Sequence, residues 1–137
     1  MVNFNGTIQE NSAVVIESNR GFLVGDAIFE SIKVVHNKVL FLEDHYFRLM
    51  ASMRICRMEI PMLLTMEYFE AQILQLIASL PKSNSFRVRF SVYRTAEGFY
   101  APVSNEVEFI VTAIPLQQDV YQIDKEQYEV ELYKDFY

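Results

Sequence analysis

Along this 137-residue chain, the apolar residues first recur at every second position, then at helical intervals, and then again at every second position. Apolar and polar side chains alternate in Ala27–Val35, which is typical of a strand with one buried face. From about residue 42 to residue 56 the apolar residues recur at helical intervals, and a second such stretch follows Thr65. Alternation returns at residues 86–94. This order predicts an α+β fold, with two helices packed on one face of a mostly antiparallel sheet.

Turn signals and short apolar runs predict the remaining elements. Asn5-Gly6 lies between the extended segments Val2–Phe4 and Thr7–Gln9 and is a strong signal for a two-residue hairpin. Residues 18–21 are expected to form a loop. Further strands are predicted at residues 39–42, 107–114 and 128–137. The run at 107–114 is almost entirely apolar, which favours a central place in the sheet.

The predicted helices carry several core candidates. Thr65 can cap the second helix. Cys56 falls on the apolar stripe of the first helix, so we expect it in the core. The methionines are also expected to fill the core: Met50, Met53, Met58, Met62 and Met66.

The bulk composition excludes several classes of protein. The length predicts one domain, and a hydrophobic content of 51% predicts a globular one. A net charge of −6 without a basic stripe argues against nucleic-acid binding. No apolar stretch has the length of a membrane span, no signal peptide is visible, and the histidines and cysteine have no metal-ligand spacing. The single cysteine, Cys56, excludes an internal disulfide and suits a reducing cytoplasm.

Arg48 is the first candidate for a binding residue. It lies near the start of the first helix, three residues after His45. A guanidinium at this place can bind a phosphate through two hydrogen bonds. The alternative is an arginine on the solvated face of the helix, and the spacing alone leaves both interpretations open.

The arginine cluster Arg87, Arg89 and Arg94 is the second candidate, and Arg87 and Arg89 share one face of a strand whose other face is apolar. Two neighbouring cations are unfavourable unless something anionic lies between them. A substrate carboxylate, a cofactor phosphate or nearby acidic side chains would serve, and a solvated strand face is the alternative.

The order of the motifs is more specific than any one of them. Alone, Gly21 and Gly25 indicate a turn, because they form no nucleotide-binding fingerprint. In sequence, however, R-G-x-x-x-G-D-x-x-F-E is followed by L-x-x-H-x-x-R-L-x-x-S and then by I-P. The matching residues are Arg20, Gly21, Gly25, Asp26, Phe29, Glu30, Leu42, His45, Arg48, Leu49, Ser52, Ile60 and Pro61. This pattern resembles the N-terminal region of the class IV (fold-type IV) pyridoxal 5′-phosphate (PLP) aminotransferases. More loosely, the resemblance covers most of the chain.

The resemblance implies that residues 1–137 are the small N-terminal domain of a two-domain enzyme. That enzyme would transfer an amino group between an amino acid and a 2-oxo acid. Arg48 resembles the arginine that binds the PLP phosphate. Phe29 resembles an aromatic residue facing the substrate, and Arg89, with Arg87 as a rival, a residue that anchors a substrate carboxylate. Gly25 resembles a glycine near the dimer contact, so the resemblance also implies a homodimer.

The chain departs from the family pattern in several places. Val24 stands where branched-chain enzymes usually have tyrosine, and residues 97–100 replace an arginine and a histidine of the D-amino-acid enzymes. No lysine, Lys134 included, has the context of the Schiff-base lysine, and the glutamate that pairs with the pyridine nitrogen is missing. We therefore expect these groups in a C-terminal domain, and we expect the chain alone to be inactive, with no catalytic residue and no metal.

Two alternatives stay open. Aminodeoxychorismate lyase, which produces 4-aminobenzoate for folate, shares the same N-terminal pattern. A non-catalytic α+β dimerisation or binding module would have the same fold without the chemistry. For the aminotransferase and for the lyase, the expected partners are small molecules. No nucleic-acid or membrane partner is expected for any of the three possibilities.

Overall fold

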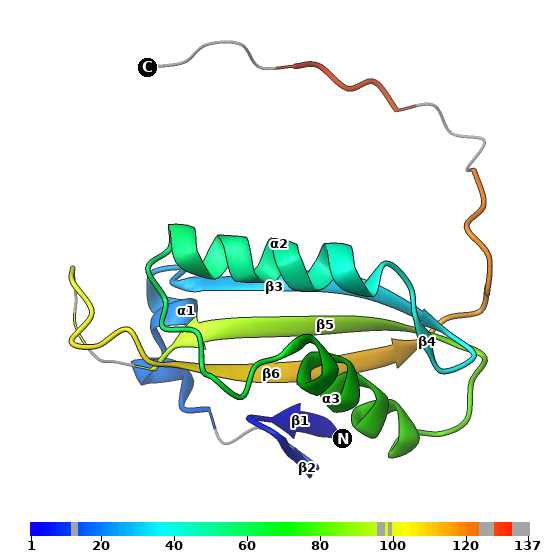
Figure 1. Ribbon diagram of the computed structural model, residues 1–137, viewed down its shortest axis with the longest axis horizontal. Coiled ribbons are helices and arrows are strands. Elements are labelled where there is room, and N and C mark those ends of the chain that lie inside the picture. Colours follow the sequence, from blue (N-terminus) through cyan, green and yellow to red (C-terminus); the bar gives the residue numbers. More distant parts are fainter. Residues whose placement is uncertain (12–13, 96–97, 99, 124–127, 133–137) are drawn as a thin grey trace.

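The structure is a computed structural model that describes residues 1–11, 14–95, 98, 100–123 and 128–132. Its centre is a six-stranded sheet of order β2-β1-β6-β5-β3-β4, in which every neighbouring pair is antiparallel. Two helices, α2 and α3, lie on the same face of this sheet (Figure 1). The strands are β1 (Val2–Phe4), β2 (Thr7–Gln9), β3 (Ala27–Val35), β4 (Lys38–Val39), β5 (Ser85–Arg94) and β6 (Val107–Pro115). The helical elements are η1 (Ile16–Ser18), α1 (Arg20–Leu23), α2 (Leu42–Ile55) and α3 (Met66–Ala78). The α+β prediction is confirmed.

The core lies between the sheet and the two long helices. Phe90 of β5 stacks on Phe109 of β6 at 5.0 Å between ring centroids, and Phe69 of α3 lies 4.6 Å from Phe90. The fully buried residues around them come from both layers: Ile32, Val34, Leu49, Met53, Ile73, Leu76, Val88, Val92 and Val111. Because the side chains of a strand alternate, the other face of β3 and β5 carries mainly polar and charged residues, with Phe29 among them.

Local signals explain where the elements begin. The Asn5-Gly6 hairpin forms as predicted, with positive φ at both residues, as its turn type requires. The Thr65 hydroxyl accepts a hydrogen bond from the Tyr68 amide at 3.2 Å and caps α3 as predicted. The strand predicted at residues 39–42 ends at Val39 instead, because Phe41 adopts a left-handed conformation (φ 53°) that turns the chain into α2.

Three further predictions were wrong. Residues 18–21 are mostly helical, not a loop, since the Asn19 side chain accepts a hydrogen bond from the Phe22 amide and starts α1. Cys56 is exposed, because α2 ends at Ile55 and the apolar stripe ends with it. Met62 is 98% exposed on the connection between α2 and α3.

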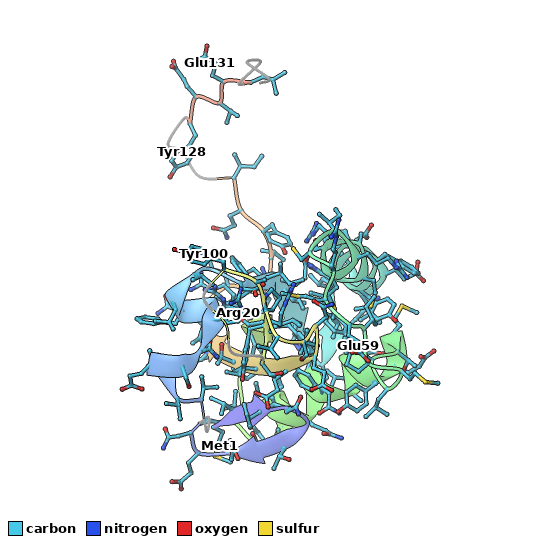
Figure 2. All side chains as sticks on the ribbon, turned by 90° about the vertical axis from the view of Figure 1, so that its left-hand side faces the viewer. Met1, Arg20, Glu59, Tyr100, Tyr128 and Glu131 are labelled. Atoms are coloured by element: carbon cyan, nitrogen blue, oxygen red, sulfur yellow. The ribbon has the colours of Figure 1, made fainter. Side chains whose placement is uncertain are left out.

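The predicted strand at residues 128–137 is not formed where the structure describes it. Residues 128–132 have no regular secondary structure, and Val130 is 94% exposed. The chain runs away from the sheet after β6, and Tyr128 and Glu131 lie on this outlying segment (Figure 2). An alternating pattern becomes a strand only beside a neighbouring strand. Lys134 lies outside the described residues. No helix in the described residues is both long and apolar enough to cross a membrane.

Candidate functional site

The neighbours Phe29 and Glu30 on β3 point to opposite faces of the sheet. Phe29 is 54% exposed on the face without the long helices. Glu30 is 5% exposed and lies on the face that α2 covers. Because β3 separates them, each belongs to a different group of charged residues.

The outer group consists of Phe29, Arg87 and Arg89. They line a cavity of about 330 Å³, the outer pocket, together with Ser31, Thr112, Ala113 and Ile114. The register places Arg89 directly between Ser31 and Thr112, and Arg87 between Lys33 and Ile114. The Arg89 guanidinium lies over the Phe29 ring, 3.8 Å from its centroid. A cation stacked on an aromatic ring is held in place without losing its hydrogen-bond donors.

No acidic side chain is among the residues that line the outer pocket. Glu108 lies on the same face, but its carboxylate accepts a hydrogen bond from the Tyr93 hydroxyl at 2.8 Å, further along β5. Lys33, opposite Arg87, adds a third cation to this face of the sheet outside the outer pocket, and its Nζ lies 4.2 Å from the centre of the Tyr121 ring. The outer pocket is therefore a positively charged cavity suited to an anion such as a carboxylate.

The inner group is an ion-paired cluster of Glu30, His45 and Arg48. Arg48 Nε donates to Glu30 Oε1 at 2.8 Å, and Arg48 Nη2 donates to Oε2. His45 Nδ1 lies 2.7 Å from the same Oε2 and 3.1 Å from Arg48 Nη2. Both α2 residues reach Glu30 because residues three apart share one face of a helix.

The electrostatics of this cluster favour the charged forms of Glu30 and Arg48. Burial raises the pKa of Glu30, but the hydrogen bonds and charges of Arg48 and His45 outweigh it, so the pKa lies below its ordinary value of 4.5. The hydrogen bond and charge of Glu30 in turn raise the pKa of Arg48. The Arg48 side chain is nevertheless 61% exposed. Its Nη1 has no hydrogen-bond partner in the described part of the chain, so it is accessible to a ligand.

The structure brings together only some of the predicted site residues. Phe29, Arg87 and Arg89 share the outer pocket, while Arg48 lies on the other face of the sheet. Glu30 occupies the Nε–Nη2 edge of Arg48, so a phosphate would meet the remaining Nη1–Nη2 end. That end fits an anionic oxygen, and Arg48 is therefore compatible with a cofactor phosphate. The sequence signal for Glu30, a charged residue among apolar neighbours on one strand face, was visible but was not assigned a role.

Arg94 does not join Arg87 and Arg89. It is 6% exposed on the opposite side of β5, where its Nη1 donates to Asn105 Oδ1 at 3.1 Å and its Nη2 donates to the Cys56 carbonyl at 2.6 Å. Asp26 lies between Arg94 and Arg20, 3.4 Å and 2.8 Å from their Nε atoms. This cluster connects three loops and serves the fold. Gly25, beside it, has a φ of +70°, which explains the glycine.

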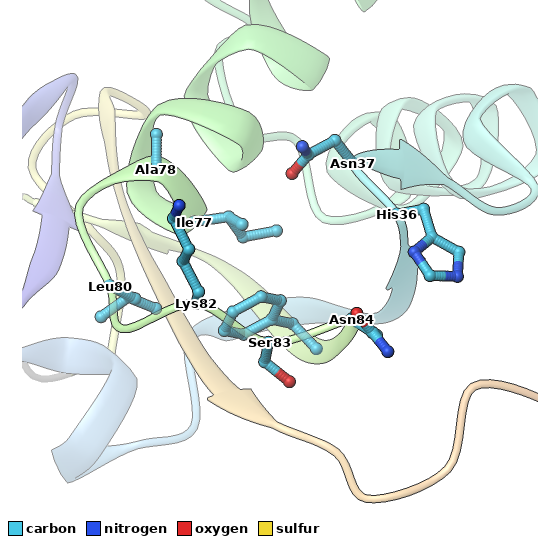
Figure 3. Close-up of a pocket in the computed structure, with 9 residues that line it drawn as sticks. His36, Asn37, Ile77, Ala78, Leu80, Lys82, Ser83 and Asn84 are labelled. Carbon is cyan, nitrogen blue, oxygen red and sulfur yellow. The ribbon is translucent and has the colours of Figure 1, made fainter.

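A larger cavity of about 520 Å³ lies away from both groups. Figure 3 shows it between the β3–β4 turn, with His36 and Asn37, and the segment from Ile77 to Asn84. None of the predicted site residues lines it.

The chain matches the family model described as amino-transferase class IV over residues 27–135. Similar solved structures include the branched-chain aminotransferase of Thermoproteus uzoniensis with norvaline (TM-score 0.72, 22% identity), covering 85% of this chain and 41% of that one. They also include the branched-chain amino acid aminotransferase of Escherichia coli (TM-score 0.71, 20% identity), where the match covers 84% of this chain and 39% of that one. A third is the branched-chain amino acid aminotransferase of Thermobaculum terrenum in its PLP form (TM-score 0.71, 20% identity), where the match covers 85% of this chain and 40% of that one. The chain thus spans about 40% of the length of these structures, and at this identity they show the fold. A search of curated proteins found no significant sequence match.

Proposed function

Because this chain belongs to the class IV aminotransferases, we propose that it is the N-terminal domain of a PLP-dependent enzyme. That enzyme transfers an amino group between an amino acid and a 2-oxo acid. The family match over residues 27–135 supports this assignment, as does the length of the chain relative to the solved structures. PLP, when bound, supplies the electron sink for amino transfer. The residues of this chain contribute binding and orientation.

The observation that carries the proposal is the outer pocket. Arg89 is fixed by its contact with Phe29, and Arg87 lies two residues away on the same face. Two guanidinium groups without a carboxylate among the lining residues suit the carboxylate that amino acids and 2-oxo acids share. In the proposal Arg89 is the main anchor of this carboxylate, Phe29 forms a wall of the substrate site, and Arg48 binds the cofactor phosphate.

In this proposal one bound molecule reaches both groups across the edge of β3. β4 pairs with β3 only at Val34 and Val35, so within the described residues the stretch around Phe29 and Glu30 has no strand on that side. A substrate–cofactor complex at this edge can contact the outer pocket on one face and Arg48 on the other. We therefore assign Arg48, Phe29, Arg89 and Arg87 to one active site.

Titration of the isotope-labelled chain with 2-oxoglutarate tests the assignment. The amide resonances of β3, β5 and β6 around the outer pocket are expected to shift saturably, and Arg89→Ala is expected to abolish most of the shift. Arg54→Ala, at an exposed arginine of α2, is the control for a loss of charge. Shifts that survive Arg89→Ala, or that centre elsewhere, would contradict the substrate site.

The intact protein is further proposed to be a cytoplasmic homodimer. The exposed apolar residues Phe22, Leu23 and Val24 lie beside Gly25 and offer a contact surface. The single exposed cysteine is consistent with a reducing compartment. A lyase that releases 4-aminobenzoate would use the same domain, and identifying the product with aminodeoxychorismate as substrate distinguishes the two reactions.

A further inference from the structure

Glu30 is the one acidic residue in the buried layer of the described chain. The other residues of β3 on its face, Ile28, Ile32 and Val34, are apolar and contribute to the core. A buried carboxylate is unfavourable unless it is paired and hydrogen-bonded. An apolar residue at this position would complete the strand face, so the packing of the core does not call for a glutamate here.

Both partners of Glu30 come from the first two turns of α2. Arg48 donates through Nε and Nη2, and His45 Nδ1 lies 2.7 Å from Glu30 Oε2. Because a carboxylate only accepts hydrogen bonds, this contact is a hydrogen bond when the His45 proton is on Nδ1. Glu30 and His45 are nearly enclosed, with side chains 5% and 12% exposed, whereas the Arg48 side chain is 61% exposed. The cluster therefore has a buried base and a solvent-facing cationic end.

This arrangement fixes the direction of a side chain that would otherwise be mobile. An arginine on an exposed helix face samples many rotamers and loses that freedom when it binds a ligand. The two-point contact with Glu30 removes the freedom beforehand and leaves the Nη1–Nη2 end directed outward. Preorganisation of this kind raises affinity by lowering the entropy lost on binding.

We propose that Glu30 and His45 are positioning residues that orient Arg48 for the phosphate of the cofactor. This inference rests on the proposed function of Arg48. Glu30 carries a negative charge next to a site for an anion, so the effect of Glu30 on phosphate affinity has two opposing contributions. If charge alone mattered, removing Glu30 would strengthen phosphate binding. If positioning dominates, removing it weakens phosphate binding.

The test measures binding of pyridoxamine 5′-phosphate, which carries the phosphate but no aldehyde, to the 137-residue chain. Glu30→Gln removes the charge at nearly constant volume, and Glu30→Asp keeps the charge but shortens the side chain. Both variants are expected to lower the affinity, by roughly tenfold, the equivalent of 1.4 kcal/mol. The control is Glu43→Gln, which removes an exposed carboxylate from the first turn of the same helix and should not weaken binding.

A second readout follows the Arg48 Nε–H resonance in the ligand-free chain. It is expected to be ordered in the wild type and in Glu43→Gln, and averaged by motion in both Glu30 variants and, to a smaller extent, in His45→Gln. This readout does not depend on a ligand. A mobile Arg48 Nε–H in the wild type would overturn the positioning role even if a Glu30 variant failed to fold.

The outcomes separate the two proposals. Unchanged binding in Arg48→Ala would refute the phosphate site of the proposed function. An Arg48 Nε–H that is ordered in the wild type and mobile in the Glu30 variants would still show that Glu30 orients Arg48. Weakened binding in Arg48→Ala, with unchanged or stronger binding in Glu30→Gln, would refute the positioning role alone.

Discussion

At the scale of single residues, the pair Phe29-Glu30 assigns the two faces of β3 to different tasks. Phe29 holds Arg89 in the outer pocket, and Glu30 holds Arg48 in the second turn of α2. In the proposed site each arginine offers its donors to a ligand, while the contact with Phe29 or Glu30 fixes its direction. Arg94, in contrast, is buried, and its Nη1 and Nη2 donate to Asn105 and Cys56 of the protein itself.

Replacement of Arg48 by alanine is expected to weaken binding of pyridoxamine 5′-phosphate by about 1.5–3 kcal/mol, because one charge-assisted hydrogen-bonding group is lost. Isothermal titration calorimetry on the chain and its variant measures this difference. Arg54→Ala removes the same charge from the last turn of α2 and should have little effect. Equal losses in the two variants would mean that binding follows net charge, as expected for an arginine on a solvated helix face.

The lowered pKa of Glu30 predicts that this residue contributes to the loss of folding stability in acid. Since the folded-state pKa lies below the ordinary value of 4.5, ionised Glu30 stabilises the fold above that pH, and this contribution is lost as the pH falls through the lowered pKa. Urea unfolding between neutral pH and about pH 3 should show the loss in the wild type and a smaller one in Glu30→Gln. Glu43→Gln is the control. An identical acid dependence in wild type and Glu30→Gln would contradict the ion-paired cluster.

At the scale of elements, prediction from sequence succeeded where a signal was local or periodic. Ala27–Val35 and the capped helix after Thr65 were found because alternation and capping act within a few residues. Residues 39–42 were misread because the left-handed Phe41 carries no glycine or asparagine signal. Residues 128–132 alternate like a strand, but strand formation depends on a distant neighbour.

The candidate site was predictable only where its signal lay within a single element. Alternation alone put Arg87 and Arg89 on one face, whereas the contact of Arg89 with Phe29 depends on the pairing of β3 with β5. The contact between Glu30 and Arg48 also depends on how α2 lies over β3, which spacing within either element does not reveal.

The cap of α3 gives a prediction at this scale. Thr65→Ala is expected to destabilise the chain by about 1 kcal/mol, because the Tyr68 amide loses the hydroxyl that accepts its hydrogen bond. Urea denaturation measures the change. Thr65→Ser keeps the hydroxyl and should retain most of the stability. Equal stability of the wild type and Thr65→Ala would show that the cap contributes nothing.

At the scale of the whole molecule, α2 and α3 cover one face of the sheet (Figure 1). The residues that line the outer pocket lie mainly on the opposite face. Large apolar side chains remain exposed on α1 and beyond β6, among them Phe22 at 71%, Val130 at 94% and Leu132 at 75%. Exposed apolar area of this kind promotes association. The net charge of −6 opposes it weakly, because salt screens the repulsion.

The chain is therefore expected to self-associate as its concentration rises, and sedimentation velocity over a range of concentrations measures this. Phe22→Asn should shift the equilibrium toward the monomer. Met62→Asn is the control, since Met62 is 98% exposed on the connection between α2 and α3. A wild-type chain that stays monomeric at high concentration would argue against the proposed dimer surface.

In the proposed enzyme, this chain contributes Arg48 and the outer pocket but not the lysine that holds the cofactor covalently. The most direct measurement incubates the chain with PLP, reduces it with borohydride and maps the modified lysines by mass spectrometry. We expect no single lysine to be labelled stoichiometrically and saturably, because none has the sequence context of the family lysine. A stoichiometric, saturable adduct on one lysine, such as Lys134, would contradict the account.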